Sequence, residues 1–208
     1  MSYPIPYVTT RTNQGERTVD IYSRLLADRV IYLGTAIDDG VANAIIAQLI
    51  HLESESPDQP VNLYINSSGG SIPATLAIYD AMQYIRCDVE TTCVGQAAAT
   101  AAMLLAGGAA GKRQILPHGR VVIHAPAAEG HGAIPDLVLE ADEIERVRTM
   151  LEEILAQHTG RTPEQVREDT DRDLILTAYA ALDYGVVDSV LSNRAGLGGQ
   201  ADRASGAA

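Results

Sequence analysis

The fold of this chain is constrained most by a regular alternation between short aliphatic runs and longer helical patterns. Runs of about 4–8 β-branched and aliphatic residues are typical of buried strands. Segments whose apolar residues recur every three or four positions are typical of amphipathic helices. Strands that alternate with helices predict an α/β domain with a largely parallel sheet. The expected strands are 30–33, 61–65, 89–94, 121–123 and 186–190, and the expected helices are 39–52, 73–85, 97–106, 135–158 and 163–169.

These elements form one expected domain between two different ends. Residues 1–17 are polar and mixed, with Pro4 and Pro6 close together, and they predict a mobile N-terminal arm. Residues 193–208 are rich in glycine, alanine and serine and have almost nothing to bury, so a disordered tail is expected there. The domain between them, 18–192, contains no stretch that resembles a linker.

Composition excludes several classes of protein. The chain is 46% hydrophobic and 20% charged, so it can bury a core. Its formal net charge of −12 repels phosphate backbones, so no nucleic-acid partner is expected. It has no run of about 18 apolar residues and no signal-peptide pattern, so no membrane partner is expected. Since Cys87 and Cys93 are the only cysteines, we expect no disulfide framework and a cytoplasmic location.

Neither a metal nor a cofactor is expected. For an EF-hand, the acidic run 169–173 would need glycine and glutamate where Leu174 and Ala180 stand. Gly111 and Lys112 are followed by Arg113 rather than by the serine or threonine of a phosphate-binding loop.

Two strand ends share a design that suits anion recognition. One is the turn 66–71, which contains Gly69 and Gly70, and the other is the turn 95–100. Glycine lets the backbone approach a bound atom closely, and the first N–H groups of a helix have no internal partner. Each turn could hold a phosphate or the oxyanion of an attacked carbonyl, or could be an ordinary tight turn.

These segments together resemble the proteolytic subunits of the Clp (caseinolytic) protease, a family of serine peptidases. The resemblance covers roughly residues 15–194, and the motifs occur in the order found in the family. They are Asp20-Ile21-Tyr22-Ser23-Arg24-Leu25-Leu26, Leu63-Tyr64-Ile65-Asn66-Ser67 with Gly69-Gly70, Gly95-Gln96-Ala97-Ala98, Ile123-His124-Ala125-Pro126, His158-Thr159-Gly160, Asp169 to Asp173, and Tyr184-Gly185-Val186-Val187-Asp188.

The resemblance implies an architecture and a set of partners. The implied fold is the ClpP/crotonase type, a spiral of βαβ units with a long handle helix. The family assembles as two stacked seven-membered rings around a proteolytic chamber, into which an AAA+ Clp unfoldase feeds unfolded polypeptide. No cofactor is implied.

The resemblance also implies roles in acyl transfer. His124, which by itself would be interpreted as structural, takes the position of the general base, and Asp173 that of its orienting carboxylate. The backbone N–H groups of Gly70 and Thr100 take the positions of the oxyanion donors. A serine would attack the peptide carbonyl, and water would then release the acyl-enzyme.

The sequence departs from the family at the nucleophile, where Ala99 replaces serine. Loss of the nucleophile from a triad lowers turnover by roughly 10⁶-fold, so the chain is expected to be inactive. We do not expect Thr100, Ser67 or Ser68 to replace the missing hydroxyl. Two explanations stay open: an engineered replacement of serine, or a naturally non-catalytic ring subunit that pairs with an active paralogue.

A second departure concerns the surface that receives the unfoldase. Apart from that surface, Ser68 in the glycine turn replaces the proline that the family usually has before the glycine pair. Burying an unpaired polar group costs about 1–3 kcal/mol, so polar replacements in the docking pocket predict weakened docking. The positions that keep apolar or aromatic character are Leu25, Tyr64, Tyr84 and Leu191, and the polar ones are His51, Asn62 and Gln114.

Three further expectations concern substrate pairing, the coupling of the rings and an alternative enzyme class. Residues 129–132 are expected to form an edge strand that pairs with the extended substrate, or else a glycine-rich loop. Arg172 lies where the family couples its two rings to the active site. A crotonase-like acyl-CoA enzyme is the remote alternative, but it would require a catalytic glutamate near the oxyanion turns and basic residues for the CoA phosphates, neither of which is evident.

Overall fold

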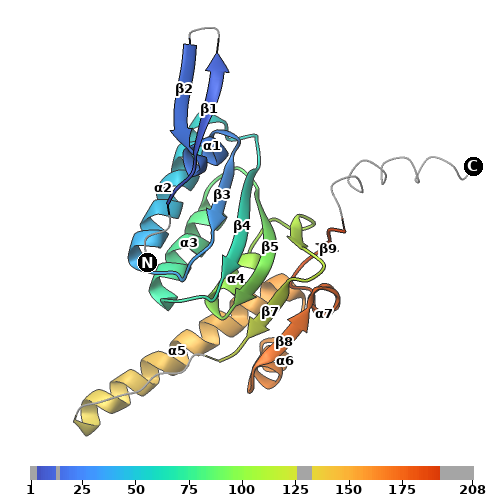
Figure 1. Ribbon diagram of the computed structural model, residues 1–208. Coiled ribbons are helices and arrows are strands. Elements are labelled where there is room, and N and C mark those ends of the chain that lie inside the picture. Colours follow the sequence, from blue (N-terminus) through green and yellow to red (C-terminus); the bar gives the residue numbers. More distant parts are fainter. Residues whose placement is uncertain (1–3, 13–14, 126–132, 193–208) are drawn as a thin grey trace, which may run out of the picture.

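The computed structural model describes residues 4–12, 15–125 and 133–192. Its centre is a sheet in the order β3 (Val30–Leu33), β4 (Val61–Ser67), β5 (Val89–Ala98), β6 (Arg113–Ile115) and β9 (Ser189–Val190), all paired in parallel (Figure 1). Strand β7 (Arg120–Ile123) pairs in parallel with the end of β5 and antiparallel with β8 (Leu174–Thr177). The expected α/β fold with a largely parallel sheet is confirmed.

Helices cover one face of this sheet, and the side chains along its strands alternate between that face and the opposite one. On β4, Val61, Leu63 and Ile65 are fully buried, whereas Asn62 and Tyr64 on the opposite face are only partly covered. The covering helices are α2 (Asp39–Glu55) and α3 (Ile72–Tyr84), which lie side by side in Figure 1. Helix α4 (Thr100–Ala106) is buried from Ala101 to Ala106 and lies at the centre of the core.

The N-terminal segment that was expected as an arm contains an antiparallel hairpin. Strands β1 (Tyr7–Thr12) and β2 (Gly15–Asp20) pair with each other and project from the domain (Figure 1). The expected arm boundary at residue 17 falls inside β2, and helix α1 (Ile21–Ala27) follows directly. The mobility of this arm stays a prediction, and the expected tail 193–208 lies outside the described residues.

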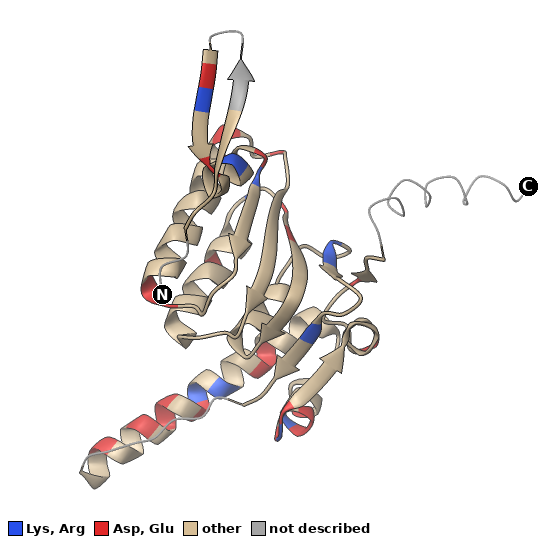
Figure 2. Cartoon of the chain, viewed as in Figure 1, with Lys and Arg blue, Asp and Glu red and all other residues tan. Residues whose placement is uncertain are grey.

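The long helix α5 (Ile134–Thr159) belongs to the core only at its C-terminal half. Leu155 and Ala156 are buried there, and Gly160 ends the helix in a left-handed conformation with φ 73°, as the sequence predicts. The other half extends away from the domain and carries mainly acidic charges (Figure 2). Helices α6 (Pro163–Asp169) and α7 (Ala178–Tyr184) follow α5 in sequence. No helix among the described residues is long and apolar enough to cross a bilayer.

A polar cluster around Arg113 of β6 joins the C-terminal end of α5 to the sheet. The Arg113 side chain, 9% exposed, binds the Asp188 carboxylate, and its Nη1 donates to the carbonyl of His158 at 2.7 Å. His158 Nε2 lies 2.8 Å from the hydroxyl of Tyr79. Burial, and secondarily the charge of Arg113, lower the pKa of His158 below its ordinary value of 6.5. The folded protein therefore holds this imidazole neutral.

This cluster predicts a pH-dependent stability. As pH falls below 6.5, unfolded His158 takes up a proton that the folded imidazole resists, so the unfolding free energy should decrease. His158→Gln should flatten that decrease, whereas His118→Gln, at an exposed turn, should not. Denaturant unfolding at several pH values between 5 and 8 measures how the unfolding free energy of each protein depends on pH. Equal slopes in the original chain and in His158→Gln would contradict the assignment.

Candidate active site

Strand β5 ends in a strained turn at Ala99. A helix was expected from residue 97, but Gln96, Ala97 and Ala98 pair with β7, and this pairing outweighs the helix propensity of alanine. Ala99 then takes φ 51° and ψ −124°, a backbone conformation rare outside glycine that costs on the order of 1–3 kcal/mol. Its N–H donates to the carbonyl of Val122 at 2.8 Å. Strained strand-to-helix turns of this kind present the nucleophile of α/β-hydrolases.

The glycine loop after β4 packs directly against this turn. A Cβ added to Gly69, which has φ +83°, would lie 2.9 Å from Ala99 Cβ and 3.0 Å from Thr100 N. A Cβ on Gly70 would lie 2.1 Å from the carbonyl oxygen of Ile37, with which Gly70 forms a β-bridge. Both positions therefore require glycine, and the two turns predicted separately from the sequence meet in one place.

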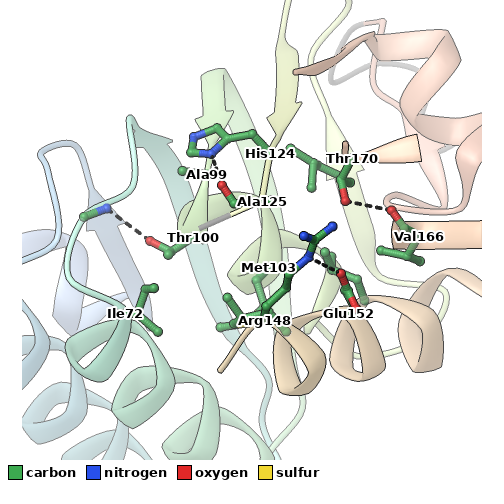
Figure 3. Close-up of a pocket in the computed structure, with 14 residues that line it drawn as sticks. Ile72, Ala99, Thr100, Met103, His124, Ala125, Arg148, Glu152, Val166 and Thr170 are labelled. Carbon is green, nitrogen blue, oxygen red and sulfur yellow. Dashed lines mark hydrogen bonds and ion pairs between the residues drawn. The ribbon is translucent and has the colours of Figure 1, made fainter. Parts of the chain in front are cut away.

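One of the two expected oxyanion donors, the N–H of Gly70, is already hydrogen-bonded to the hydroxyl of Thr100. The N–H of Gly70 donates to Thr100 Oγ1 at 3.1 Å (Figure 3). The hydroxyl of Thr75 lies 3.0 Å from the same oxygen. A substrate carbonyl can accept from Gly70 only after the Thr100 side chain rotates away. Sequence reasoning placed the backbone of Thr100 here but did not anticipate this contact by its side chain.

The expected base and its carboxylate lie on neighbouring strands. Ile123 of β7 pairs with Leu174 of β8, so the same antiparallel register places His124 opposite Asp173 just beyond the ladder. His124 Nδ1 lies 3.0 Å from the carbonyl oxygen of Ala125, and the described residues include no hydrogen bond or ion pair to the exposed Asp173. In this geometry a backbone carbonyl, rather than Asp173, orients the imidazole.

One cavity of about 180 Å³ unites the other expected positions. Gly70, Ala99, Thr100 and His124 all line it, and Figure 3 shows the His124 ring beside Ala99. Its walls also include two side chains of α5 that sequence reasoning missed, Arg148 and Glu152. The signal for them was their opposite charge at a spacing of four residues on one helix.

The expected docking residues lie in three places. Asn62, Tyr64 and Gln114 share the sheet face opposite α2 and α3, because Tyr64 pairs with Thr92 and Thr92 with Gln114. His51, 54% exposed, lies on α2 near Glu55, and Tyr84, 87% exposed, ends α3. The remaining two, Leu25 on α1 and Leu191 after β9, are partly buried.

Two other expectations have simple outcomes. The edge strand 129–132 lies outside the described residues. Arg172 is exposed, with no interaction among the residues that the structure describes, so its coupling role stays a prediction. No group of histidine, cysteine and acidic residues in the described ranges could hold a metal ion.

Comparisons with known proteins identify the family. A strained turn, a glycine loop and a histidine around one cavity have the layout of a serine-peptidase site, and the family model described as Clp protease matches residues 13–194. The chain belongs to the Clp protease family. It is 63% identical over 194 residues, 93% of this chain and 98% of the relative, to ATP-dependent Clp protease proteolytic subunit 1 of Nocardia farcinica. It is 54% identical over 190 residues, 91% of this chain and 98% of the relative, to ATP-dependent Clp protease proteolytic subunit 4 of Rhodococcus jostii.

The contact between Thr100 and Gly70 predicts a protected backbone amide. Thr100→Val removes the acceptor and should speed hydrogen exchange at the Gly70 N–H roughly fivefold, as loss of a hydrogen bond worth about 1 kcal/mol implies. Thr100→Ser keeps the hydroxyl and should leave the rate nearly unchanged. Mass spectrometry of exchanged peptides that cover the loop measures both rates, and equal rates in Thr100→Val and the original chain would contradict the contact.

Proposed function

We propose that this chain is a subunit of a compartmentalised, ATP-dependent serine endopeptidase of the Clp type, and that Ala99 leaves it unable to cleave. One observation carries the proposal: the Ala99 turn faces the cavity shared by Gly70, Thr100 and His124, but its methyl group can neither attack a carbonyl nor release a proton. The proposal includes unfolded polypeptide as substrate, assembly in stacked seven-membered rings, an AAA+ Clp unfoldase as partner and a cytoplasmic location.

The geometry supports separate roles in acyl transfer for the residues around position 99. With Nδ1 donating to the carbonyl of Ala125, Nε2 of His124 is left as the acceptor that a base requires. A serine hydroxyl at position 99 would lose its proton to that nitrogen while its oxygen bonds to the peptide carbonyl carbon. The amides of Gly70 and Thr100 would stabilise the oxyanion, and the imidazolium would return the proton to the leaving amine. Asp173 would stabilise the imidazolium, once the two side chains meet.

Without the hydroxyl, the site can hold a carbonyl but cannot form an acyl-enzyme. An engineered replacement of serine and a natural non-catalytic subunit that pairs with an active paralogue share this chemistry, and we favour the engineered replacement because the rest of the machinery is kept. The codon for position 99 in the native gene distinguishes the two.

Restoring the hydroxyl should restore activity. Ala99→Ser, alone or mixed with a paralogous ring, should cleave short fluorogenic peptides and react with a fluorophosphonate probe at position 99. The unaltered chain should do neither, since the nucleophile contributes roughly 10⁶-fold. Ala99→Ser/His124→Ala is the control and should lose the activity again. If Ala99→Ser stays inert in every assembly, a purely structural subunit is favoured, and cleavage by the unaltered chain would refute the proposal.

The docking surface allows a separate test of the unfoldase partnership. His51→Leu, Asn62→Tyr and Gln114→Leu together should strengthen binding of an AAA+ Clp unfoldase at least tenfold, because each polar group costs about 1–3 kcal/mol when a docking loop buries it unpaired. Asn43→Leu, exposed elsewhere on α2, is the control. Binding to immobilised unfoldase measures the change, and unchanged binding would remove these positions from the docking surface.

The crotonase-like alternative receives limited support from one residue. Glu152 lines the cavity, where an acyl-CoA enzyme would need a carboxylate. Both of its oxygens are bound by arginines, however, at 2.8 Å and 2.9 Å, so it offers no free base. The peptidase remains the better proposal.

A further inference from the structure

The cavity beside Ala99 contains a charged pair that the acyl-transfer roles leave unused. Arg148 and Glu152 lie one turn apart on α5, and the Arg148 Nε donates to Glu152 Oε1 at 2.8 Å (Figure 3). The Glu152 side chain is only 7% exposed and that of Arg148 25%. Charges so far from water persist only when they are paired and hydrogen-bonded, so this pair has a defined position in the wall of the cavity.

Both oxygens of the Glu152 carboxylate are already bound by arginines. Its Oε1 is taken by Arg148, and its Oε2 accepts from Nε of Arg167 on α6 at 2.9 Å. The charge of Arg167 is shared further with Glu145 at the surface, at 3.2 Å. Two guanidinium groups therefore surround one buried carboxylate, and with Glu145 the cluster contains two positive and two negative side chains.

The terminal nitrogens of Arg148 are available to a ligand. Among the described residues, only the Nε of its guanidinium has a partner, and Figure 3 shows the two terminal nitrogens on the side away from Glu152. These nitrogens form a fork that matches a carboxylate with two parallel hydrogen bonds. The same cavity is otherwise walled by apolar side chains, among them Ile72, Met103 and Leu155.

We propose that this cavity binds an acidic side chain of the polypeptide, glutamate above all, next to the carbonyl that the glycine loop receives. A glutamate matches both parts of the cavity, since its methylene groups contact the apolar wall and its carboxylate meets Arg148. The overall charge of −12 does not oppose this strongly, because charges more than about 8 Å away are screened at physiological ionic strength. The inference rests on the proposed function and names its substrate preference.

Binding to the unaltered full-length chain tests the preference without any turnover. Three fluorescent tripeptide amides that differ only at the third residue, glutamate, glutamine or leucine, are titrated and followed by anisotropy. The glutamate peptide should bind roughly tenfold more tightly than the other two, since a charge-assisted hydrogen bond contributes more than about one tenfold step in affinity. Equal binding, tighter binding of the leucine peptide, or no binding of any peptide would overturn the proposal.

Variants on one helix separate Arg148 from general electrostatics. Arg148→Met should abolish the preference for glutamate, and Arg148→Lys, which keeps the charge but not the fork, should reduce it. Arg146→Met removes the same charge from an exposed pair with Glu143 outside the cavity and should leave the preference unchanged. A retained preference in a folded Arg148→Met variant would overturn the assignment, and the peptide series in the unaltered chain remains decisive if that variant fails to fold.

Turnover by the Ala99→Ser variant distinguishes this inference from the proposed function. If that variant is inert but the unaltered chain still prefers the glutamate peptide, the peptidase proposal fails and the specificity of the cavity stands. If that variant cleaves after leucine as efficiently as after glutamate, the peptidase proposal stands and the specificity fails.

Discussion

Strand β7 connects the nucleophile position to the expected base and its carboxylate through its pairing on both edges. On one edge, Arg120–Val122 pair with the last residues of β5 and hold the strained turn at Ala99. On the other, Ile123 pairs with Leu174 and brings Asp173 opposite His124. A shift of β7 by one residue would send each side chain to the opposite face, because strand side chains alternate. The register of this short strand thus sets the position of the base relative to the nucleophile position.

The glycine loop supplies the second constraint. Gly69 and Gly70 approach the Ala99 turn and the backbone of Ile37 so closely that any side chain would collide. Close packing of backbone against backbone brings an amide N–H to the cavity without a flexible side chain. In the described geometry this amide donates to Thr100, so the site is assembled but its donor is occupied.

The cavity has an apolar wall and a charged wall, and each is stabilised in a different way. Its apolar walls are continuous with the core formed by α4 and α5, and they exclude water from one side. Its charged wall depends on Glu152, whose burial is tolerable only because two arginines bind it. The arrangement fixes the guanidinium of Arg148 in the wall of the cavity, in a protein that is strongly acidic overall.

Periodicity and turn residues, which are local properties, predicted the alternation of strands and helices and the end of α5 at Gly160, and the order of the motifs indicated the positions that could do chemistry. The resemblance to the Clp family implied that Gly70, Ala99, Thr100 and His124 belong together, and all four line one cavity. Residues 97 and 98 extend a strand instead of starting a helix because they pair with β7, and no local pattern reveals that partner since it is distant in sequence. The tertiary structure also brings the hydroxyl of Thr100 to the N–H of Gly70 and places Arg148 in the wall of the cavity. These are contacts between elements, and their energies depend on burial and on neighbours that no local pattern encodes.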